Sequence, residues 1–358
     1  MKHFLLITTL LFCCQTAIFA QQTLAPERNL PRPDDEIIKQ QVEYKEPGRT
    51  GENVIWDFSR LNAVNDSYSL FYYSPQATNG VYILGLDTVA ASLPDDEKLF
   101  VGEEHNTMYY YRFDGNRLWT LGHENPTTLL RYSEPLLTAV FPIAFGEKYS
   151  EKYSASGLYS ATDEFSVSGQ VDICADATGI MVLPSKDTLR NVIRVKSVRS
   201  SVEKDGVSSL ENVYWYARGY RYPVFETVRL TKSDRETFAS AFYFPPDRHY
   251  YLDDDTENLA LHDENPDTDS NPWAGLAYNL FPNPTTSLLN IELYLPKAAT
   301  VRIQIHSQAG AMVLNSAKGR LSEGLQTIQQ DVSFLPVGNY ALIVFLDEYP
   351  VNEILMKR

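Results

Sequence analysis

Apolar and polar residues alternate along most of the chain from about residue 50 onward. In residues 53–59, for example, Val54, Trp56 and Phe58 fall on one side and polar residues on the other, a pattern typical of a half-buried strand. The alternation returns in residues 107–113, 117–122, 191–203 and 211–230, and Gly-containing turn signals separate these runs. Short strands at this spacing predict an all-β body, either a large antiparallel β-sandwich or a barrel.

Helices are predicted at only two places, residues 34–45 and 233–242. The strand pattern stops at residues 253–272, which hold eight acidic residues and no Lys or Arg. Such a segment has too little to bury to offset the entropy of ordering, so residues 253–277 are predicted to be a solvated linker. The alternative is a weak divalent-ion site, although the spacing of a calcium-binding loop is missing.

Alternation resumes after this acidic stretch, in a segment whose turns carry Gly310 and Gly319. We therefore expect a body at residues 21–252 and a separate small Ig-like β-sandwich at residues 278–358. Whether the body is one domain or two stays open at this point.

The first twenty residues have a basic start, an apolar run from Phe4 to Cys14 and small residues before Gln21. This layout predicts a secretory signal peptide at residues 1–20, cut between Ala20 and Gln21. The apolar run is too short to span a bilayer, and no later segment approaches the roughly 20 apolar residues that a membrane helix needs. No transmembrane segment is therefore predicted.

The formal net charge of −15 argues against nucleic acid and anionic lipid as partners. Removal of the signal peptide would leave Cys174 as the sole cysteine, which excludes an intrachain disulfide. An exported chain without disulfides has to rely on its apolar core.

The common catalytic motifs are missing from the sequence, including the G-x-S-x-G elbow, the H-E-x-x-H pair, phosphate-binding loops and paired-cysteine metal spacings. No catalytic residue, cofactor or metal ion is predicted. Whether the protein is an enzyme stays open, because carboxylate pairs of the glycosidase type are close in space and not in sequence.

The chain holds 23 Tyr and 17 Phe, and several of them cluster in aromatic runs. Alternation should place about half of these rings on an exposed sheet face, where Tyr and Trp can contact a ligand. The candidate face for an unknown glycan or protein ligand consists of Tyr214, Tyr216, Arg218, Tyr220 and Arg221. The alternative is that these rings form core and cross-strand pairs.

A resemblance to a known family appears in the C-terminal segment. Residues 281–287 (FPNPTTS), residues 300–313, residues 335–344 (LPVGNYALIV) and the basic end resemble the type A C-terminal sorting domain of type IX secretion substrates, an export route of the Bacteroidota. The residues that carry this motif are Pro282, Asn283, Pro284, Gly310, Leu335, Pro336, Gly338, Tyr340 and Lys357.

This resemblance implies several partners and modifications. The outer-membrane type IX translocon would recognise the domain, a sortase-like peptidase would remove it near the linker, and the body could be joined to anionic lipopolysaccharide. Two tripeptides, beginning at Asp87 and Asp187, match the O-glycosylation signal of these bacteria, with Thr88 and Thr188 as acceptors. Most of residues 50–230 resembles an uncharacterised β-rich region that occurs ahead of such domains.

Together, these features predict a protein exported to the cell surface or the extracellular space, with a body that acts as an adhesin-like binding module for a glycan or protein. Two alternatives stay open. The body could be a secreted hydrolase without a recognisable motif, or a structural component of the cell surface.

Overall fold

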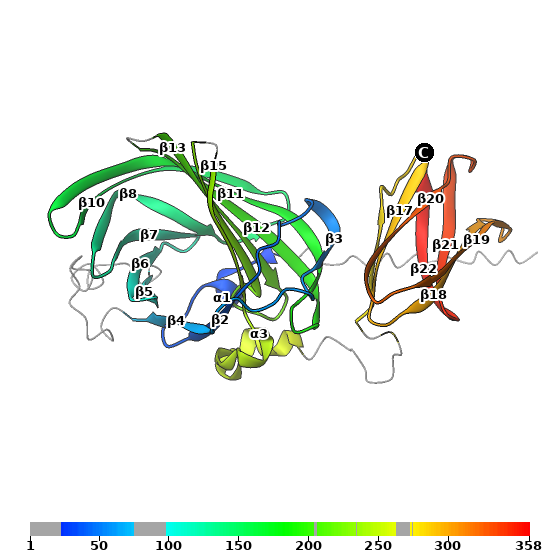
Figure 1. Cartoon of the computed structure of the whole chain (residues 1–358), viewed down its shortest axis with the longest axis horizontal. Helices are drawn as coiled ribbons and strands as arrows, with labels where there is room; N and C mark the ends of the chain where they lie inside the picture. The colour runs from blue at the N-terminus through cyan, green and yellow to red at the C-terminus, as the bar shows by residue number, and fades with distance from the viewer. Residues whose placement is uncertain (1–22, 75–97, 204–205, 234, 263–272, 274) are drawn as a thin grey trace, which may run out of the picture.

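The computed structural model of the chain describes residues 23–74, 98–203, 206–233, 235–262, 273 and 275–358. The chain forms a β-barrel body and a smaller C-terminal β-sandwich (Figure 1). The predicted all-β class is confirmed, with a barrel as the body. No helix in these residues is long and apolar enough to cross a membrane.

Twelve antiparallel strands close the barrel within the described residues, because β10 pairs with β8 on one side and with β11 on the other. In barrel order they are β10 (Lys148–Tyr159), β8 (Thr128–Val140), β7 (Arg117–Glu124), β6 (Thr107–Phe113), β5 (Lys98–Glu104), β4 (Tyr68–Tyr73), β2 (Glu36–Val42), β15 (Arg235–Tyr243), β14 (Phe225–Lys232), β13 (Gly206–Ala217), β12 (Thr188–Glu203) and β11 (Asp163–Val182). Closure pairs the edges that an open sheet would expose.

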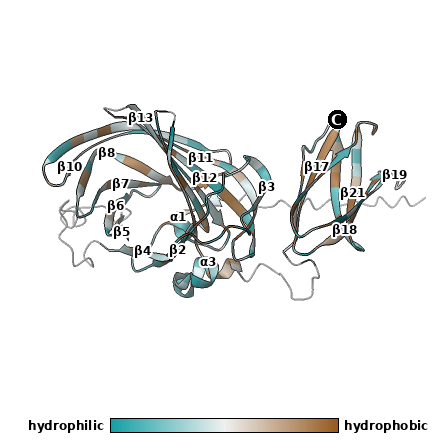
Figure 2. Ribbon diagram, in the orientation of Figure 1, coloured by the Kyte–Doolittle hydropathy of each residue, from teal (hydrophilic) through white to brown (hydrophobic). Residues whose placement is uncertain are grey.

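Hydrophilic and hydrophobic residues follow one another along the barrel strands (Figure 2). Successive residues of a barrel strand face the lumen and the outside in turn. On β13, Tyr214 and Tyr216 line an interior cavity, whereas Trp215 belongs to a core on the outer face. Strand β3 (Gly51–Asp57), which pairs in parallel with β11, covers this outer face. Trp56, next to β3's end, meets Trp215 edge-on with ring centres 6.1 Å apart.

One end of the barrel is closed by short elements from both ends of the body. They are β1 (Thr23–Leu24), which pairs with β9 (Ile143–Ala144), α1 (Pro26–Asn29), η1 (Pro246–Arg248), η2 (Tyr250–Asp254) and α3 (Thr256–His262). We call these elements and the residues between them, 23–35 and 244–262, the plug. The plug brings Leu24 and Leu30 into the same apolar cluster as Phe100 and Ile173 of the barrel wall.

The two predicted helices are wrong. Residues 34–45 contain β2 and residues 233–242 contain most of β15. In β2, Ile37 and Lys39 lie two residues apart and are both buried, which fits a period of two. Pairing of β2 with β4 and β15 decides its structure, because tertiary contacts override weak helix propensity.

The predicted linker at residues 253–277 is also shorter than expected. Its first ten residues belong to the plug, where α3 forms and the side chains of Asp255 and Asn258 are buried. The physical reason is that Asp255 forms a buried ion pair with Arg221. This charge-assisted contact stabilises the folded acidic segment more than solvation of the free carboxylate would stabilise an extended one. Residues 263–272 lie outside the described part of the chain.

The C-terminal domain is a sandwich of two sheets. One sheet contains β16 (Ala277–Phe281), β17 (Leu288–Leu295) and β20 (Gly324–Asp331), and the other contains β19 (Met312–Leu321), β18 (Ala299–Ser307), β21 (Gly338–Leu346) and β22 (Tyr349–Lys357). Alternate residues of both sheets, such as Ile291, Ile303 and Leu342, are fully buried in one core between them.

The sandwich contacts the barrel through β3 and its surroundings. Ile55 of β3 packs with Ala277 and Tyr294 of the sandwich. Arg49 pairs with Glu292 at 3.0 Å between Nη2 and Oε2 and lies over the Phe281 ring. The two domains therefore share a small apolar contact flanked by an ion pair.

Candidate functional site

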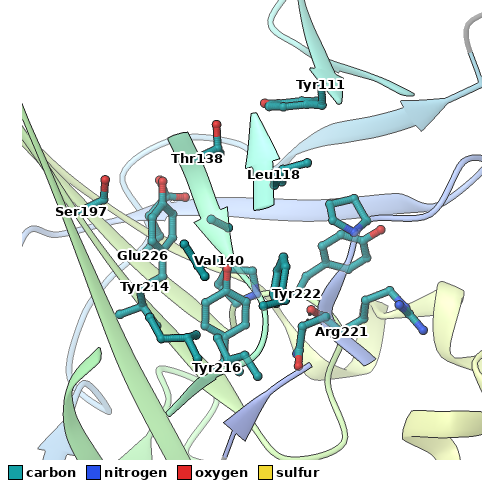
Figure 3. A pocket seen from close by; sticks show the side chains of 18 of the residues that line it. Tyr111, Leu118, Thr138, Val140, Ser197, Tyr214, Tyr216, Arg221, Tyr222 and Glu226 are labelled. Atoms are coloured by element: carbon teal, nitrogen blue, oxygen red, sulfur yellow. Dashed lines mark hydrogen bonds between the residues drawn. The ribbon is translucent and has the colours of Figure 1, made fainter. Parts of the chain in front are cut away.

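A cavity of about 190 Å³ lies inside the barrel, next to the plug (Figure 3). Its lining combines aliphatic residues with the hydroxyls of several tyrosines and a small group of charged side chains. The residues that line the cavity include Lys39, Tyr72, Glu104, Tyr111, Leu118, Thr138, Val140, Val195, Ser197, Tyr214, Tyr216, Arg221, Tyr222 and Glu226. A concave, mostly apolar site with a few polar groups is the usual form of a small-molecule pocket.

Lys39 is the centre of the charged group. Its Nζ lies 2.7 Å from Glu104 Oε1 and 3.1 Å from Glu226 Oε2, and the side chain is only 7% exposed. The strand order explains these contacts, because β2 lies two strands from β5 on one side and two strands from β14 on the other. Burial opposes the charge of Lys39, but the attraction to Glu226 and Glu104 together outweighs it and holds the pKa of Lys39 well above its usual value, so Lys39 stays charged.

The pKa values of the two carboxylates are shifted in opposite directions. Burial pushes the pKa of Glu104 upward, but the charge of Lys39 and hydrogen bonds from Lys39 and the Tyr68 hydroxyl outweigh it and lower that pKa. For Glu226, burial is the largest effect, the charge of Lys39 opposes it, and the charge of Glu104 adds to it, so the pKa of Glu226 is raised. The fold therefore favours ionised Glu104 and disfavours ionised Glu226.

Tyrosines form much of the cavity wall. Burial raises the pKa of Tyr72, Tyr111, Tyr214 and Tyr216, so all four stay neutral phenols that can donate a hydrogen bond. The Tyr214 hydroxyl accepts a hydrogen bond from the Asn212 amide at 3.0 Å. Within the described part of the chain, no hydrogen bond joins the hydroxyl of Tyr72 or Tyr111 to another residue. These two hydroxyls can therefore bind a molecule in the cavity.

Arg221 and the plug form the floor of the cavity. Arg221 Nε and Nη2 donate to the two carboxylate oxygens of Asp255, both at 2.8 Å, and Nη1 donates to the carbonyl of Leu30 at 2.9 Å. Burial opposes the charge of Asp255, but the hydrogen bonds from Arg221 and Asn258 outweigh it and lower the pKa of Asp255. The ion pair fixes α3 against the barrel end.

The five residues of the predicted ligand face do not lie together on an exposed surface. Tyr214 and Tyr216 point into the lumen, and Arg221 is buried against the plug. Tyr220 is 8% exposed and belongs to the outer core with Trp215, and Arg218 is the exposed member of the set. Tyr214 and Tyr216 lie on β13, whereas Tyr220 and Arg221 lie beyond the turn that follows this strand, so the two pairs of side chains do not share one face.

Other predicted positions are distributed as follows. Ala20, Gln21 and Thr88 lie outside the described residues. The Thr188 hydroxyl donates to the carbonyl of Gly275 at 3.3 Å, at the junction between barrel and sandwich, and is partly buried there. Whether Thr188 is glycosylated stays a prediction.

The C-terminal motif residues meet in space at one edge of the sandwich. The Asn283 side chain donates to the carbonyl of Ile354 at 2.7 Å and accepts from the backbone N–H of Met356 at 2.8 Å. The backbone of Thr285 bonds to Met356 and Arg358, and Lys357 is buried beside it. The segment with Pro282 and Pro284 is thereby held against the last strand, β22.

The remaining motif residues shape the turns of the sandwich. Gly310 has a φ of +80° in the turn after β18, a conformation that suits glycine. The Tyr340 hydroxyl donates to the carbonyl of Pro336 at 2.8 Å and closes the loop that contains Gly338, while Leu335 is buried in the core. The motif residues therefore help to hold one folded domain together and do not form separate recognition sites on its surface.

Sequence reasoning missed Lys39, Glu104 and Glu226. Lys39 fell in a predicted helix, and Glu104 was not among the predicted site residues. The available signal was charge at inward positions of a strand, since Glu226 follows buried Phe225 in an otherwise apolar run. That signal identifies a polar interior only once the barrel is known to close.

The two carboxylates at Lys39 give opposite stability predictions for the unliganded protein. At pH 7, Glu104→Gln should lower the free energy of unfolding by about 1.5–3 kcal/mol, because a charge-assisted hydrogen bond is lost. Glu226→Gln should raise the free energy of unfolding, because the fold disfavours the charge that this variant removes. Urea unfolding of the full-length variants measures both effects.

The pH dependence provides the control. The stabilisation from Glu104 is present above the ordinary carboxyl pKa and disappears as pH falls through its lowered pKa. The gain from Glu226→Gln should be present above the raised pKa of Glu226 and should disappear below about pH 4, where the residue is protonated in both states. Variants that shift stability in the same direction at pH 7 would contradict this assignment.

Comparison with known proteins assigns the C-terminal domain. Residues 279–352 match the family model of the secretion system C-terminal sorting domain. No curated protein matches the chain, and no solved structure matches it. The chain thus carries a type IX C-terminal sorting domain, which interacts with the type IX secretion machinery and directs export to the cell surface or the extracellular space.

Proposed function

We propose that the barrel is a binding protein that encloses a small molecule in its lumen after export through the type IX system. The observation that carries this proposal is the cavity itself, into which the Tyr72 and Tyr111 hydroxyls are free to bond. Binding in a closed barrel differs from the flat ligand face expected from the sequence, since the aromatic residues turn inward.

The chemistry of the wall supports binding of a molecule that has both apolar and polar parts. Leu118, Val140 and Val195 supply aliphatic surface, while Tyr111 and Ser197 supply hydroxyls. Burial of a ligand's apolar part would contribute roughly 25 cal/mol per Å². Hydrogen bonds to the tyrosines would fix its orientation.

Hydrolysis is the alternative function, because glycosidases use a pair of carboxylates and the cavity contains Glu104 and Glu226. Lys39 Nζ lies between them at 2.7 and 3.1 Å, in the space that a glycosidic bond would need. This arrangement favours binding over acid–base catalysis. A structural role at the cell surface gains no support from the cavity.

Processing after export belongs to the same proposal. A sortase-like peptidase would remove the sorting domain between the barrel and residue 279, and the released barrel would stay at the surface through anionic lipopolysaccharide or diffuse away. The plug, which ends with α3 at His262, would remain with the barrel.

The proposal is tested by filling the cavity. Ser197→Phe places a ring in the lumen, and Ser209→Phe on β13 is the matched control, because alternation puts it on the outer face. The full-length proteins are incubated with an extract of the growth medium, passed through gel filtration and examined by native mass spectrometry.

We expect the wild type and Ser209→Phe to retain the same small molecule and Ser197→Phe to lose it. Equal retention by all three proteins, or no retained molecule in the wild type, would contradict binding in the lumen. Chemical conversion of the retained molecule over time would instead support the hydrolase alternative.

A further inference from the structure

We infer that the molecule held in the lumen is a small organic cation, an amine whose charged nitrogen pairs with Glu226. This inference rests on the proposed binding function. It follows from the net charge of the side chains that line the cavity and from the aromatic rings among them.

The charged groups of the cavity do not balance. Among the described residues that line it, Lys39 and Arg221 are cationic and Glu104 and Glu226 are anionic. Arg221 is already neutralised by Asp255. The lumen therefore holds two carboxylates that share one ammonium, Lys39, which corresponds to a surplus of one negative charge when both carboxylates are ionised.

Glu226 is the carboxylate that can accept a further partner. Oε2 contacts Lys39 at 3.1 Å, and Oε1 receives only a long hydrogen bond from the Asn212 amide, at 3.3 Å. A carboxylate offers about four lone-pair sites, so it can accept an additional N–H donor. Figure 3 shows Glu226 beside Tyr214 at the cavity wall.

Aromatic rings surround the space in front of this carboxylate. Tyr72, Tyr111, Tyr214 and Tyr216 all line the cavity, and the face of a phenol ring attracts a cation. Lys39 is itself an example, since its Nζ lies 4.8 Å from the centre of the Phe242 ring and 5.4 Å from that of Phe244. The same type of surface is available to a ligand.

Other ligand classes fit this site less well. An anion would be placed against a surplus of carboxylate, and a neutral molecule would bring no positive charge to favour the ionised form of Glu226. Arg199, another inward cation, hydrogen-bonds Tyr132 and does not line the cavity. A bare metal ion finds no cluster of three His, Cys, Asp or Glu side chains in the described residues.

The test is a calorimetric titration of the full-length protein with three probes of similar shape: 2-phenylethylamine, 2-phenylethanol and 3-phenylpropanoate. We expect the amine to bind most tightly. Glu226→Gln should weaken amine binding by about 10- to 100-fold, the range expected for loss of a charge-assisted hydrogen bond, and leave the alcohol unchanged. Glu211→Gln, which alters an outer carboxylate paired with Arg229, is the matched control.

Each contrary outcome separates this inference from the proposed function. If the alcohol binds as tightly as the amine, or if Glu226→Gln leaves amine binding unchanged, the cation assignment is overturned while a lumenal binding site stands. If none of the probes binds, the cation assignment is also overturned, and the mass-spectrometric experiment with Ser197→Phe decides the proposed function separately.

Discussion

A chain that ends at residue 339 is expected to lose nearly all delivery to the cell surface. The deletion removes β22 and all but the first two residues of β21, and with them Leu342, Leu346 and Leu355, which are completely buried in the core of the sandwich. It also removes the backbone partners of Asn283. Cell fractionation and quantification of the protein on the cell surface measure the effect.

A point variant excludes the possibility that only gross unfolding is being observed. Asn283→Ala removes two hydrogen bonds to β22, each contributing about 0.5–1.5 kcal/mol, and leaves the barrel untouched. It should reduce surface delivery without changing barrel unfolding, whereas exposed Asn315→Ala on β19 should change neither. Normal surface levels of the chain truncated at residue 339 would show that these strands are not needed for export.

Arg221→Met is expected to lower the stability of the barrel by about 3–5 kcal/mol, the usual cost of leaving a buried charge without its partner. The variant removes both guanidinium hydrogen bonds to Asp255, which is 1% exposed and keeps, among the described residues, only Asn258 and, at 4.0 Å, Arg32. It also removes donors to the carbonyls of Leu30 and Glu27. The plug would then lose its attachment to the barrel end. Denaturant unfolding followed by tryptophan fluorescence measures the change.

The control is Arg218→Ala, three residues away and exposed, which should stay within about 0.5 kcal/mol of the wild type. The difference between wild type and Arg221→Met should shrink in acid. Asp255 has a lowered pKa, so its stabilisation is present above the ordinary carboxyl range and is lost as pH falls through that lowered value. An Arg221→Met protein as stable as the wild type would contradict the role of this ion pair.

The sequence predicted the strands well because their alternation is local. Val213, Tyr214, Trp215 and Tyr216 show a period of two, which identifies a strand with two different faces wherever it pairs. The alternation did not show which face of the strand would point into the lumen. That choice depends on closure through β10 and β11, a pairing between residues whose contact no local pattern indicates.

The failures have a common physical origin in buried charge. Lys39 made β2 resemble an exposed helix, and the acidic residues around Asp255 made α3 and its approach resemble a linker. In both cases a partner distant in sequence, Glu226 or Arg221, compensates for burial. Sequence patterns that treat charge as solvated cannot include such a partner.

The C-terminal motif was predicted in order and position because its residues are fixed by one small fold. Asn283 bonds to β22, and Tyr340 bonds to Pro336. These contacts require each residue at a set distance along the chain. The motif could therefore be identified from the sequence alone, unlike the cavity, whose wall is assembled from ten barrel strands and the plug.

A crystal structure of the full-length protein after incubation with growth-medium extract would show directly whether the barrel binds a small molecule. We expect electron density for one small molecule in the lumen, in contact with Tyr72, Tyr111 and Glu226. We also expect that Ser197→Phe, treated in the same way, shows no such density. A wild-type lumen that holds only water after this incubation would contradict the assignment of the barrel as a binding protein.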